Sequence, residues 1–213
     1  MIPIKKQPEP PHFFDTVQKP GEEFLAHHPE ARGSKLRAYW RAIIPDLHQA
    51  YRGICAYTCH WIPPDTGWNT IDHFKPKERY PDDAYRWDNY RLVCGTVNGR
   101  KGTNEDVLDP FTLQEGWFAM HFPSLQLTSG KHVPKEEMKR VEQTIRILKL
   151  NDSTCVRGRR SWLQPYLDGM YGMAYLEEKA PFLASELKRQ NLADVNLPLW
   201  EDFRKAQFKR RLF

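Results

Sequence analysis

The sequence predicts an α+β fold: a small core of two strands and one helix embedded in a single, mainly helical domain. Three observations lead to this prediction. Short β-rich runs and a turn-rich segment fall between residues 54 and 98. Apolar residues recur at helical spacing on both sides of them. Residues 1–34 contain six prolines and little periodicity, which is typical of an extended arm. We therefore expect an arm over 1–34, the core and its preceding helix over 35–110, and a mainly helical region over 111–213.

The arm and the core are predicted element by element. The arm is expected to pack through Phe13, Phe14, Val17 and Phe24. Apolar residues over 36–51 predict a helix that Pro45 kinks or divides in two. Residues 54–58 and 69–73 predict a hairpin, because the turn-rich run 63–67 lies between them. Residues 92–94 then lead into a short helix around residue 98.

The region after residue 110 is predicted to be mostly helical. Strands are expected around 117–120 and 125–127. Pro134, followed by two glutamates, opens a helix whose apolar face is Met138, Val141, Ile145 and Leu148. Residues 151–153 end that helix and cap the next one. Residues 175–187 also predict a helix that continues past Pro181.

The chain has 213 residues, of which 40% are hydrophobic, and a net charge of +5. This composition is typical of a globular protein. A chain of this length can bury a core without a disulfide or a metal. It has no apolar run that could cross a membrane and no apolar secretory segment at its start, so we expect a cytoplasmic protein. The basic charge permits a polyanionic partner. Disulfides between the four cysteines are not expected in that compartment.

The polar residues between positions 72 and 101 suit phosphodiester hydrolysis. That reaction needs an activated water, neutralised charge and a stabilised leaving oxygen. The neutral side chain of His73 is a suitable base near neutral pH. Asp72 and Asn98 supply the oxygen ligands that Mg²⁺ or Mn²⁺ prefers. Asp72 and His73, as neighbours at a strand end, are expected to address one phosphate from two sides.

Three further residues complete the predicted site. Asn89 is expected to fix the connecting loop against the backbone of His73. Arg100 and Lys101 are expected to contact phosphate oxygens. Two of the candidate site residues also have a simpler explanation. His73 alone is typical of a hydrogen-bonded core histidine, and Asn98-Gly99 alone is a turn signal.

Residues 55–109 resemble an HNH endonuclease, the ββα-metal fold of nucleases. The Asp-His pair, the central Asn and the final Asn of that motif match Asp72-His73, Asn89 and Asn98 position by position. The resemblance implies that His73 is the general base, Asp72 and Asn98 are metal ligands, and Asn89 is the orienting residue. Over about residues 53–160 the chain also resembles the HNH subunit of Septu-type anti-phage systems, which works beside an ATPase. The matching segments are C-A-Y, I-D-H-F-K-P-K, Y-P-D-D-A-Y-R-W-D-N-Y, L-D-P-F, G-K-H-V-P and T-I-R-I-L-K-L-N followed by Arg157.

The cysteines depart from the pattern of these relatives, many of which carry two C-x-x-C pairs that bind zinc. Here the first pair is one residue wider, and Val97 stands where the last cysteine would be. The candidate zinc ligands are therefore Cys55, Cys59 and Cys94, with His60 as the only nearby fourth. The alternative is a metal-free hairpin held by packing of Tyr57, Trp61, Trp68 and Trp87.

The sequence and the resemblance together predict a metal-dependent HNH endonuclease. The expected substrate is DNA, with RNA as the second choice, and the expected setting is anti-phage defence beside a protein partner such as an ATPase subunit. One alternative is a catalytically inactive nucleic-acid-binding or scaffold subunit. Another is a stand-alone, toxin-like nuclease that needs no partner.

Overall fold

The computed structural model describes residues 1–208, with side chains described through Arg204. The chain divides into two compact units. The first unit contains residues 3–57 and 61–114, and the second contains residues 1–2, 58–60 and the chain from residue 115 onward. The last five residues of the predicted region 111–213 lie outside the described residues.

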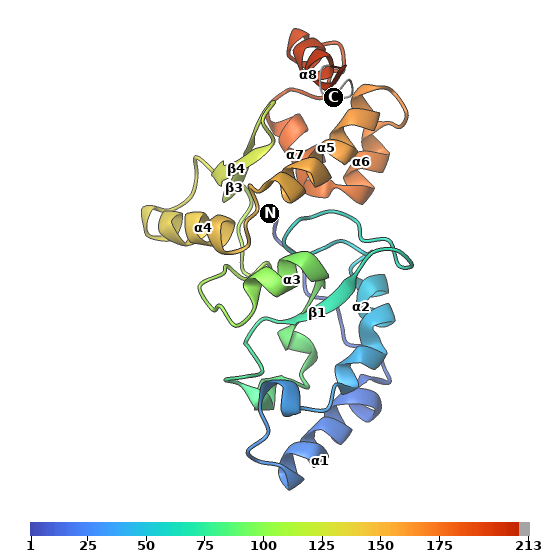
Figure 1. Ribbon diagram of the computed structural model, residues 1–213, viewed down its shortest axis with the longest axis vertical. Helices are drawn as coiled ribbons and strands as arrows, with labels where there is room; N and C mark the ends of the chain where they lie inside the picture. Colours follow the sequence, from blue (N-terminus) through green and yellow to red (C-terminus); the bar gives the residue numbers. More distant parts are fainter. Residues whose placement is uncertain (209–213) are drawn as a thin grey trace. The chain divides into compact units, whose positions relative to one another are not determined.

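The N-terminal segment of the first unit is not the extended arm that its prolines predict. A π-helical turn covers Phe14–Gln18, and helix α1 covers Lys19–His27 (Figure 1). Pro20 falls in the first turn of α1, where a proline costs no helical hydrogen bond. Phe13 and Val17 are fully buried as expected, whereas Phe14 is 48% exposed.

A 3₁₀ helix over Tyr39–Ile43 and helix α2 over Ile44–Ala50 follow. Pro45 lies in the first turn of α2. The predicted division at this proline is thus confirmed, because a proline is tolerated at the start of a helix and not in its interior.

The sheet of the first unit pairs β1, Asn69–His73, with β2, Tyr90–Cys94, in antiparallel register. Helix α3, Gly95–Lys101, follows β2 directly and lies beside β1 (Figure 1). This strand–strand–helix unit corrects the predicted hairpin, because residues 54–58 form only one isolated bridge, from Ile54 to Trp61.

Burial and backbone geometry explain that correction. Tyr90, Arg91, Leu92 and Val93 of β2 are all buried, which is the pattern of a strand covered on both faces. By contrast, positive φ angles at Arg52 and Gly53 turn the chain just before residue 54 and prevent a longer strand there.

The second unit combines a two-stranded sheet with five helices among its described residues. Strand β3, Phe118–His121, pairs antiparallel with β4, Gln126–Ser129, close to the predicted positions. The helices are α4 Lys135–Ile147, α5 Ser153–Leu167, α6 Met173–Lys179, α7 Pro181–Arg189 and α8 Pro198–Phe208. Mixed helices and small antiparallel sheets agree with the predicted α+β class.

Three local predictions are tested in the second unit. Asp152 caps α5 as expected, because its carboxylate accepts a hydrogen bond from the Cys155 amide at 2.8 Å. The helix predicted to continue past Pro181 is instead two helices, since Pro181 begins α7. On α4, Val141 is fully buried but Met138 is 39% exposed.

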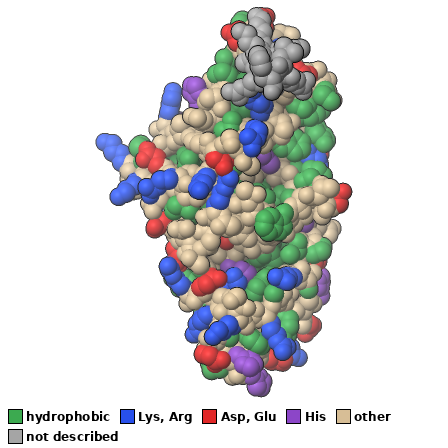
Figure 2. All heavy atoms as spheres, in the orientation of Figure 1, with side chains coloured by type: hydrophobic (Ala, Val, Ile, Leu, Met, Phe, Trp, Pro, Cys, Tyr) green, Lys and Arg blue, Asp and Glu red, His purple; other side chains and the backbone are tan. Residues whose placement is uncertain are grey.

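The positive charge is not confined to the first unit. Figure 2 shows Lys and Arg side chains gathered over α4, with acidic side chains between them. The exposed basic residues of this helix are Lys135, Lys139, Arg140 and Arg146. None of the helices within residues 1–208 is long and apolar enough to cross a membrane.

Candidate active site

A pocket of about 330 Å³ with both polar and apolar lining residues opens in the first unit between the end of β1 and helix α3. Asp72, His73 and Asn98 line this pocket, together with Trp68 and Lys77. The structure thus brings three of the predicted site residues to one cavity. The remaining predicted residues, which are Asn89, Arg100 and Lys101, do not line it.

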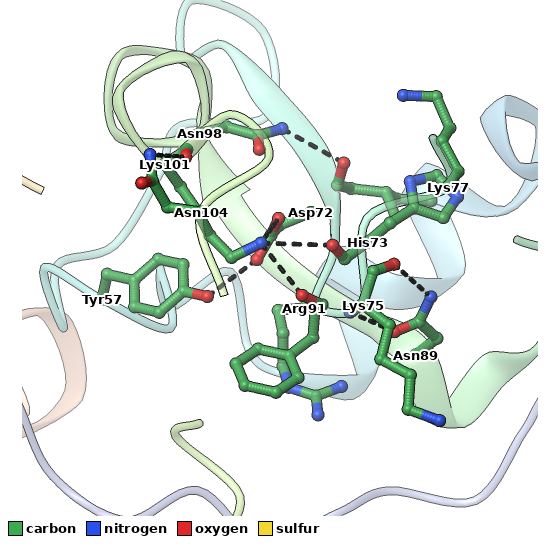
Figure 3. Close-up of polar contacts among 12 residues, drawn as sticks. Tyr57, Asp72, His73, Lys75, Lys77, Asn89, Arg91, Asn98, Lys101 and Asn104 are labelled. Carbon is green, nitrogen blue, oxygen red and sulfur yellow. Dashed lines mark hydrogen bonds and ion pairs between the residues drawn. The ribbon is translucent and has the colours of Figure 1, made fainter. Parts of the chain in front are cut away.

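Helix α3 fixes Asn98 through two hydrogen bonds to β1. The Asn98 side-chain nitrogen donates to Thr70 Oγ1 at 2.9 Å and to the Ile71 carbonyl at 3.1 Å. Thr70 Oγ1 donates its own proton to the Val93 carbonyl at 2.7 Å, so both groups facing Asn98 are acceptors. The amide oxygen therefore points elsewhere, on the side where Asp72 lies (Figure 3). Because Asn98 and Gly99 lie inside α3, their interpretation as a turn is wrong.

Asp72 is buried and has a hydrogen bond on each carboxylate oxygen. The Tyr57 hydroxyl donates to Oδ2 at 2.7 Å, and Lys101 Nζ lies 2.9 Å from Oδ1. Burial, and then the neighbouring Asp72 charge, raise the pKa of Tyr57 well above its usual range, so Tyr57 remains a donor. The carboxylate is consequently fixed from two sides.

Lys101 is fully buried, and its ammonium has three acceptors. Besides Asp72 Oδ1, it donates to the carbonyls of His73 at 3.2 Å and Phe74 at 3.1 Å (Figure 3). These three bonds use all the donors of the ammonium. Lys101 therefore lies as an internal counter-ion of Asp72, where the sequence predicted a phosphate contact. Arg100 is half-buried on the same helix.

His73 lies between two aromatic rings, with centroid distances of 4.7 Å to Trp40 and 5.2 Å to Tyr90. Its Nε2 atom is 3.0 Å from the Ala84 carbonyl oxygen. A carbonyl only accepts, so Nε2 carries the proton and Nδ1 keeps its lone pair. Burial, and then the charge of Lys77, lower the pKa of His73 to about 3. His73 is therefore a neutral histidine held in one tautomer at the wall of a pocket.

Asn89 closes the loop that connects β1 and β2. Its side-chain oxygen accepts from the Lys75 amide at 2.8 Å, and its nitrogen donates to the carbonyls of Lys75 and Asp83, both at 3.0 Å. Its backbone carbonyl also accepts from the Phe74 amide at 2.9 Å. Asn89 thus holds the two residues that follow His73, close to the backbone contact predicted for it (Figure 3).

A second buried ion pair lies next to Asp72 across the sheet. Arg91 is the register partner of Asp72 and forms two parallel hydrogen bonds to Asp109, at 2.8 and 2.7 Å. The Arg91 guanidinium also stacks on Phe111, with 3.6 Å between its central carbon and the ring centroid. Arg91 and Lys101 are therefore both buried, and each is paired with a carboxylate of this unit.

The oxygen donors of the pocket fit a hard divalent cation. Mg²⁺ is commonly held by one or two carboxylates, with water and substrate phosphate completing its shell. Each oxygen of Asp72 accepts one hydrogen bond, from Tyr57 or from Lys101, and keeps a further lone pair, and Asn98 adds an amide oxygen. The adjacent Lys101 charge opposes a cation, so any metal affinity in the absence of substrate should be weak.

The cysteines are divided between the two units. The Cys55 and Cys94 sulfurs lie 3.9 Å apart in the first unit, and the Cys94 amide donates to Cys55 Sγ at 3.4 Å. Cys59 and His60 belong to the second unit. Among the residues that the structure describes, no group of three or more His, Cys, Asp or Glu side chains is arranged to hold a metal ion. The zinc set remains a prediction.

Three groups that contact or line the site have no clear signature in the sequence. The sequence predicts a packing role for Tyr57, yet its hydroxyl donates a hydrogen bond to Asp72. The Ala84 carbonyl, which sets the tautomer of His73, is a backbone group in a loop. Trp68 was also assigned to packing, which is wrong because it is 70% exposed. Tyr57 follows Cys55-Ala56 in the C-A-Y segment, and this is the only signal that pointed to it.

Comparison with known proteins shows a partial similarity to a curated protein. No protein-family model matches this chain. Septu protein PtuB from Bacillus thuringiensis is 24% identical to it over 110 residues, which make up 52% of this chain. The chain covers about two fifths of the length of that relative, since the match spans 40% of it.

Proposed function

We propose that this chain is a metal-dependent endonuclease of the HNH type that hydrolyses phosphodiester bonds in nucleic acid, with DNA as the preferred substrate and RNA as the second choice. One observation carries the proposal. The neutral His73, fixed in a single tautomer by the Ala84 carbonyl, lines the same pocket as Asp72 and Asn98 at the end of a strand–strand–helix unit. A histidine needed only for packing would not require two oxygen donors beside it in a cavity.

The proposed chemistry follows from the atoms of His73. Its Nδ1 lone pair accepts a proton from a water molecule, the resulting hydroxide oxygen bonds to phosphorus, and the bond from phosphorus to the leaving oxygen breaks. The Nε2–H bond to Ala84 keeps Nδ1 available and spreads the charge of the imidazolium that forms. Asn89 holds the loop after His73, so that the imidazole keeps its position.

Asp72 and Asn98 are the residues proposed to hold Mg²⁺ or Mn²⁺. Such a cation would neutralise the phosphate and stabilise the leaving oxygen. Tyr57 and Lys101 orient Asp72, one on each carboxylate oxygen. Zn²⁺ at Cys55, Cys59 and Cys94 remains a separate prediction, because the proposed chemistry does not require it.

The test is cleavage of plasmid DNA by purified protein with Mg²⁺ or Mn²⁺. The matched variants are His73→Gln, which keeps a side-chain donor for the Ala84 carbonyl but lacks the base, and Asp152→Ala, which alters a helix cap in the other unit. We expect cleavage by the parent and by Asp152→Ala, and none by His73→Gln or with EDTA. Full cleavage by His73→Gln would refute the assigned base.

A role in anti-phage defence, beside a protein partner such as an ATPase subunit, is the proposed setting. It is supported by the similarity to Septu protein PtuB and by the sequence resemblance to Septu-type HNH subunits. Co-purification of the full chain from cells carrying its neighbouring genes tests the partner. A monomer that cleaves unaided would favour the stand-alone nuclease instead.

One observation favours the alternative of a catalytically inactive nucleic-acid-binding or scaffold subunit. Lys101 already neutralises Asp72, so the carboxylate is satisfied without a metal. Binding of DNA or RNA with no cleavage under any divalent cation, in the presence of the partner, would select this function.

A further inference from the structure

Trp68 is the most exposed tryptophan of the pocket region and stands directly before β1. It is 70% exposed, whereas Trp40 and Trp87 of the same unit are at most 8% exposed. A single exposed apolar side chain is ordinary and needs no explanation by itself. The position of Trp68 is more informative, because it lines the same pocket as Asp72, His73 and Asn98.

The indole of Trp68 is seated on a glycine. A Cβ atom built at Gly95 would lie only 2.0 Å from Trp68 Cδ2 and 2.3 Å from Cε3, so the ring lies flat against the backbone at that residue. The Gly95 amide also donates to the Trp68 carbonyl at 2.9 Å. One face of the ring is therefore covered by the first residue of α3, and the high exposure of the residue leaves the opposite face to solvent.

A flat ring that is supported on one face, beside a pocket with both polar and apolar residues, fits a nucleotide. The ring offers a stacking surface for a base, and the pocket offers the ammonium group of Lys77 for the phosphate. Stacking on an aromatic side chain tolerates any base, because every base has a π face. In a duplex both faces of a base are covered by its neighbours, so stacking on Trp68 requires an unpaired base.

We infer that Trp68 stacks on an unpaired nucleobase beside the phosphodiester that enters the pocket, so that the chain acts on single-stranded nucleic acid or on a base flipped out of a duplex. This inference rests on the proposed nuclease function and names its substrate class. Trp68 is a specificity-determining residue in this arrangement and does not touch the reacting atoms. Stacking is common to DNA and RNA, and the choice between them is decided by the arms of the experiment.

The experiment measures binding of fluorescently labelled oligonucleotides of about a dozen nucleotides to the full chain, by anisotropy, without divalent metal and in the His73→Gln background. The probes are single-stranded DNA, single-stranded RNA and duplex DNA. The substitutions are Trp68→Tyr, which retains an aromatic face, and Trp68→Leu, which retains apolar bulk alone. Phe14→Leu is the control, because Phe14 is another exposed aromatic residue of the same unit that does not line the pocket.

Trp68→Leu should weaken single-strand binding about 5- to 100-fold, whereas Trp68→Tyr should stay within about 3-fold of the parent. Phe14→Leu should bind like the parent. When one base at a time is removed from the strand, one abasic position should weaken binding to the parent. The same abasic position should not change binding to Trp68→Leu. Binding that is equal for the parent and Trp68→Leu, or a preference for intact duplex, would overturn the inference.

The two proposals fail in different ways. If the protein with intact His73 cleaves DNA or RNA but substitutions of Trp68 do not change its affinity, the nuclease function is supported and the stacking role is refuted. The ring would then be a contact for another protein. A protein that neither binds nor cleaves any of the probes refutes both.

Discussion

Replacing His73 with glutamine should remove part of the acid sensitivity of this protein. Glutamine keeps a nitrogen donor for the Ala84 carbonyl but does not titrate. His73 is buried between Trp40 and Tyr90, and burial, followed by the charge of Lys77, lowers its pKa from 6.5 to about 3. Between those two values the unfolded chain binds a proton at this position that the folded chain excludes.

The sign and the size of the effect follow from this difference. Stability from neutral His73 is fully present above pH 6.5 and is lost as the pH falls toward about 3. At about pH 5 the unfolded histidine is almost fully protonated and the folded one is still neutral. The free energy of unfolding should then be roughly 2 kcal/mol lower than at about pH 7 from this residue alone. The figure is insensitive to the exact folded pKa, because His73 is neutral in the folded state at both pH values.

The assay is urea unfolding of the parent and His73→Gln at those two pH values, with EDTA present and an unchanged m-value as the check for two-state behaviour. All other titrating groups contribute equally to both proteins and cancel in the comparison. We expect the parent to lose about 2 kcal/mol more than the variant on acidification. Equal losses in the two proteins would show that the folded chain does not exclude a proton from His73, which would refute the lowered pKa assigned to this buried side chain.

Three further substitutions test the neighbouring contacts. Lys101→Met leaves the buried carboxylate of Asp72 uncompensated, so it should lower the free energy of unfolding by about 3–5 kcal/mol. Mg²⁺ should then raise the melting temperature of this variant more than that of the parent. An equal response of the two proteins to Mg²⁺ would argue against a metal at Asp72. Tyr57→Phe removes a hydrogen bond to a charged group, so it should lower the free energy of unfolding, measured with urea, by about 1.5–3 kcal/mol. An unchanged free energy of unfolding would contradict the hydrogen bond from the Tyr57 hydroxyl to Asp72. Asp152→Ala should cost about 1 kcal/mol through loss of the α5 cap and leave cleavage unchanged, and a change in cleavage rate would mean that the two units are coupled.

Local signals in the sequence predicted many of the elements. Pro134 before two glutamates, and Asp152 three residues before Cys155, mark the starts of α4 and α5 because capping depends on neighbouring residues only. The pairing of strands was harder. A turn signal favoured residues 54–58 as the partner of β1, and a single charged residue, Arg91, concealed the buried character of β2.

The sequence predicted the residues of the candidate site whose role follows from side-chain chemistry. It did not predict side-chain positions that depend on packing. Asp72, His73 and Asn98 were found from residue type and spacing, and they line one pocket. The position of the Lys101 amine was missed, since spacing does not tell whether a lysine on a short helix faces outward or reaches back to β1. The place of the Trp68 ring was also missed, because the ring is seated on Gly95, a residue far away in the sequence.

The pairing of Arg91 with Asp109 limits how far the chain around the pocket can be shortened. Asp109 and Phe111 follow α3 and return to cover the guanidinium on β2. A fragment that ended at Lys101 would contain every side chain proposed for the chemistry. It would nevertheless leave a guanidinium buried without its carboxylate, a defect of about 3–5 kcal/mol. A fragment designed around the pocket should therefore extend beyond Phe111.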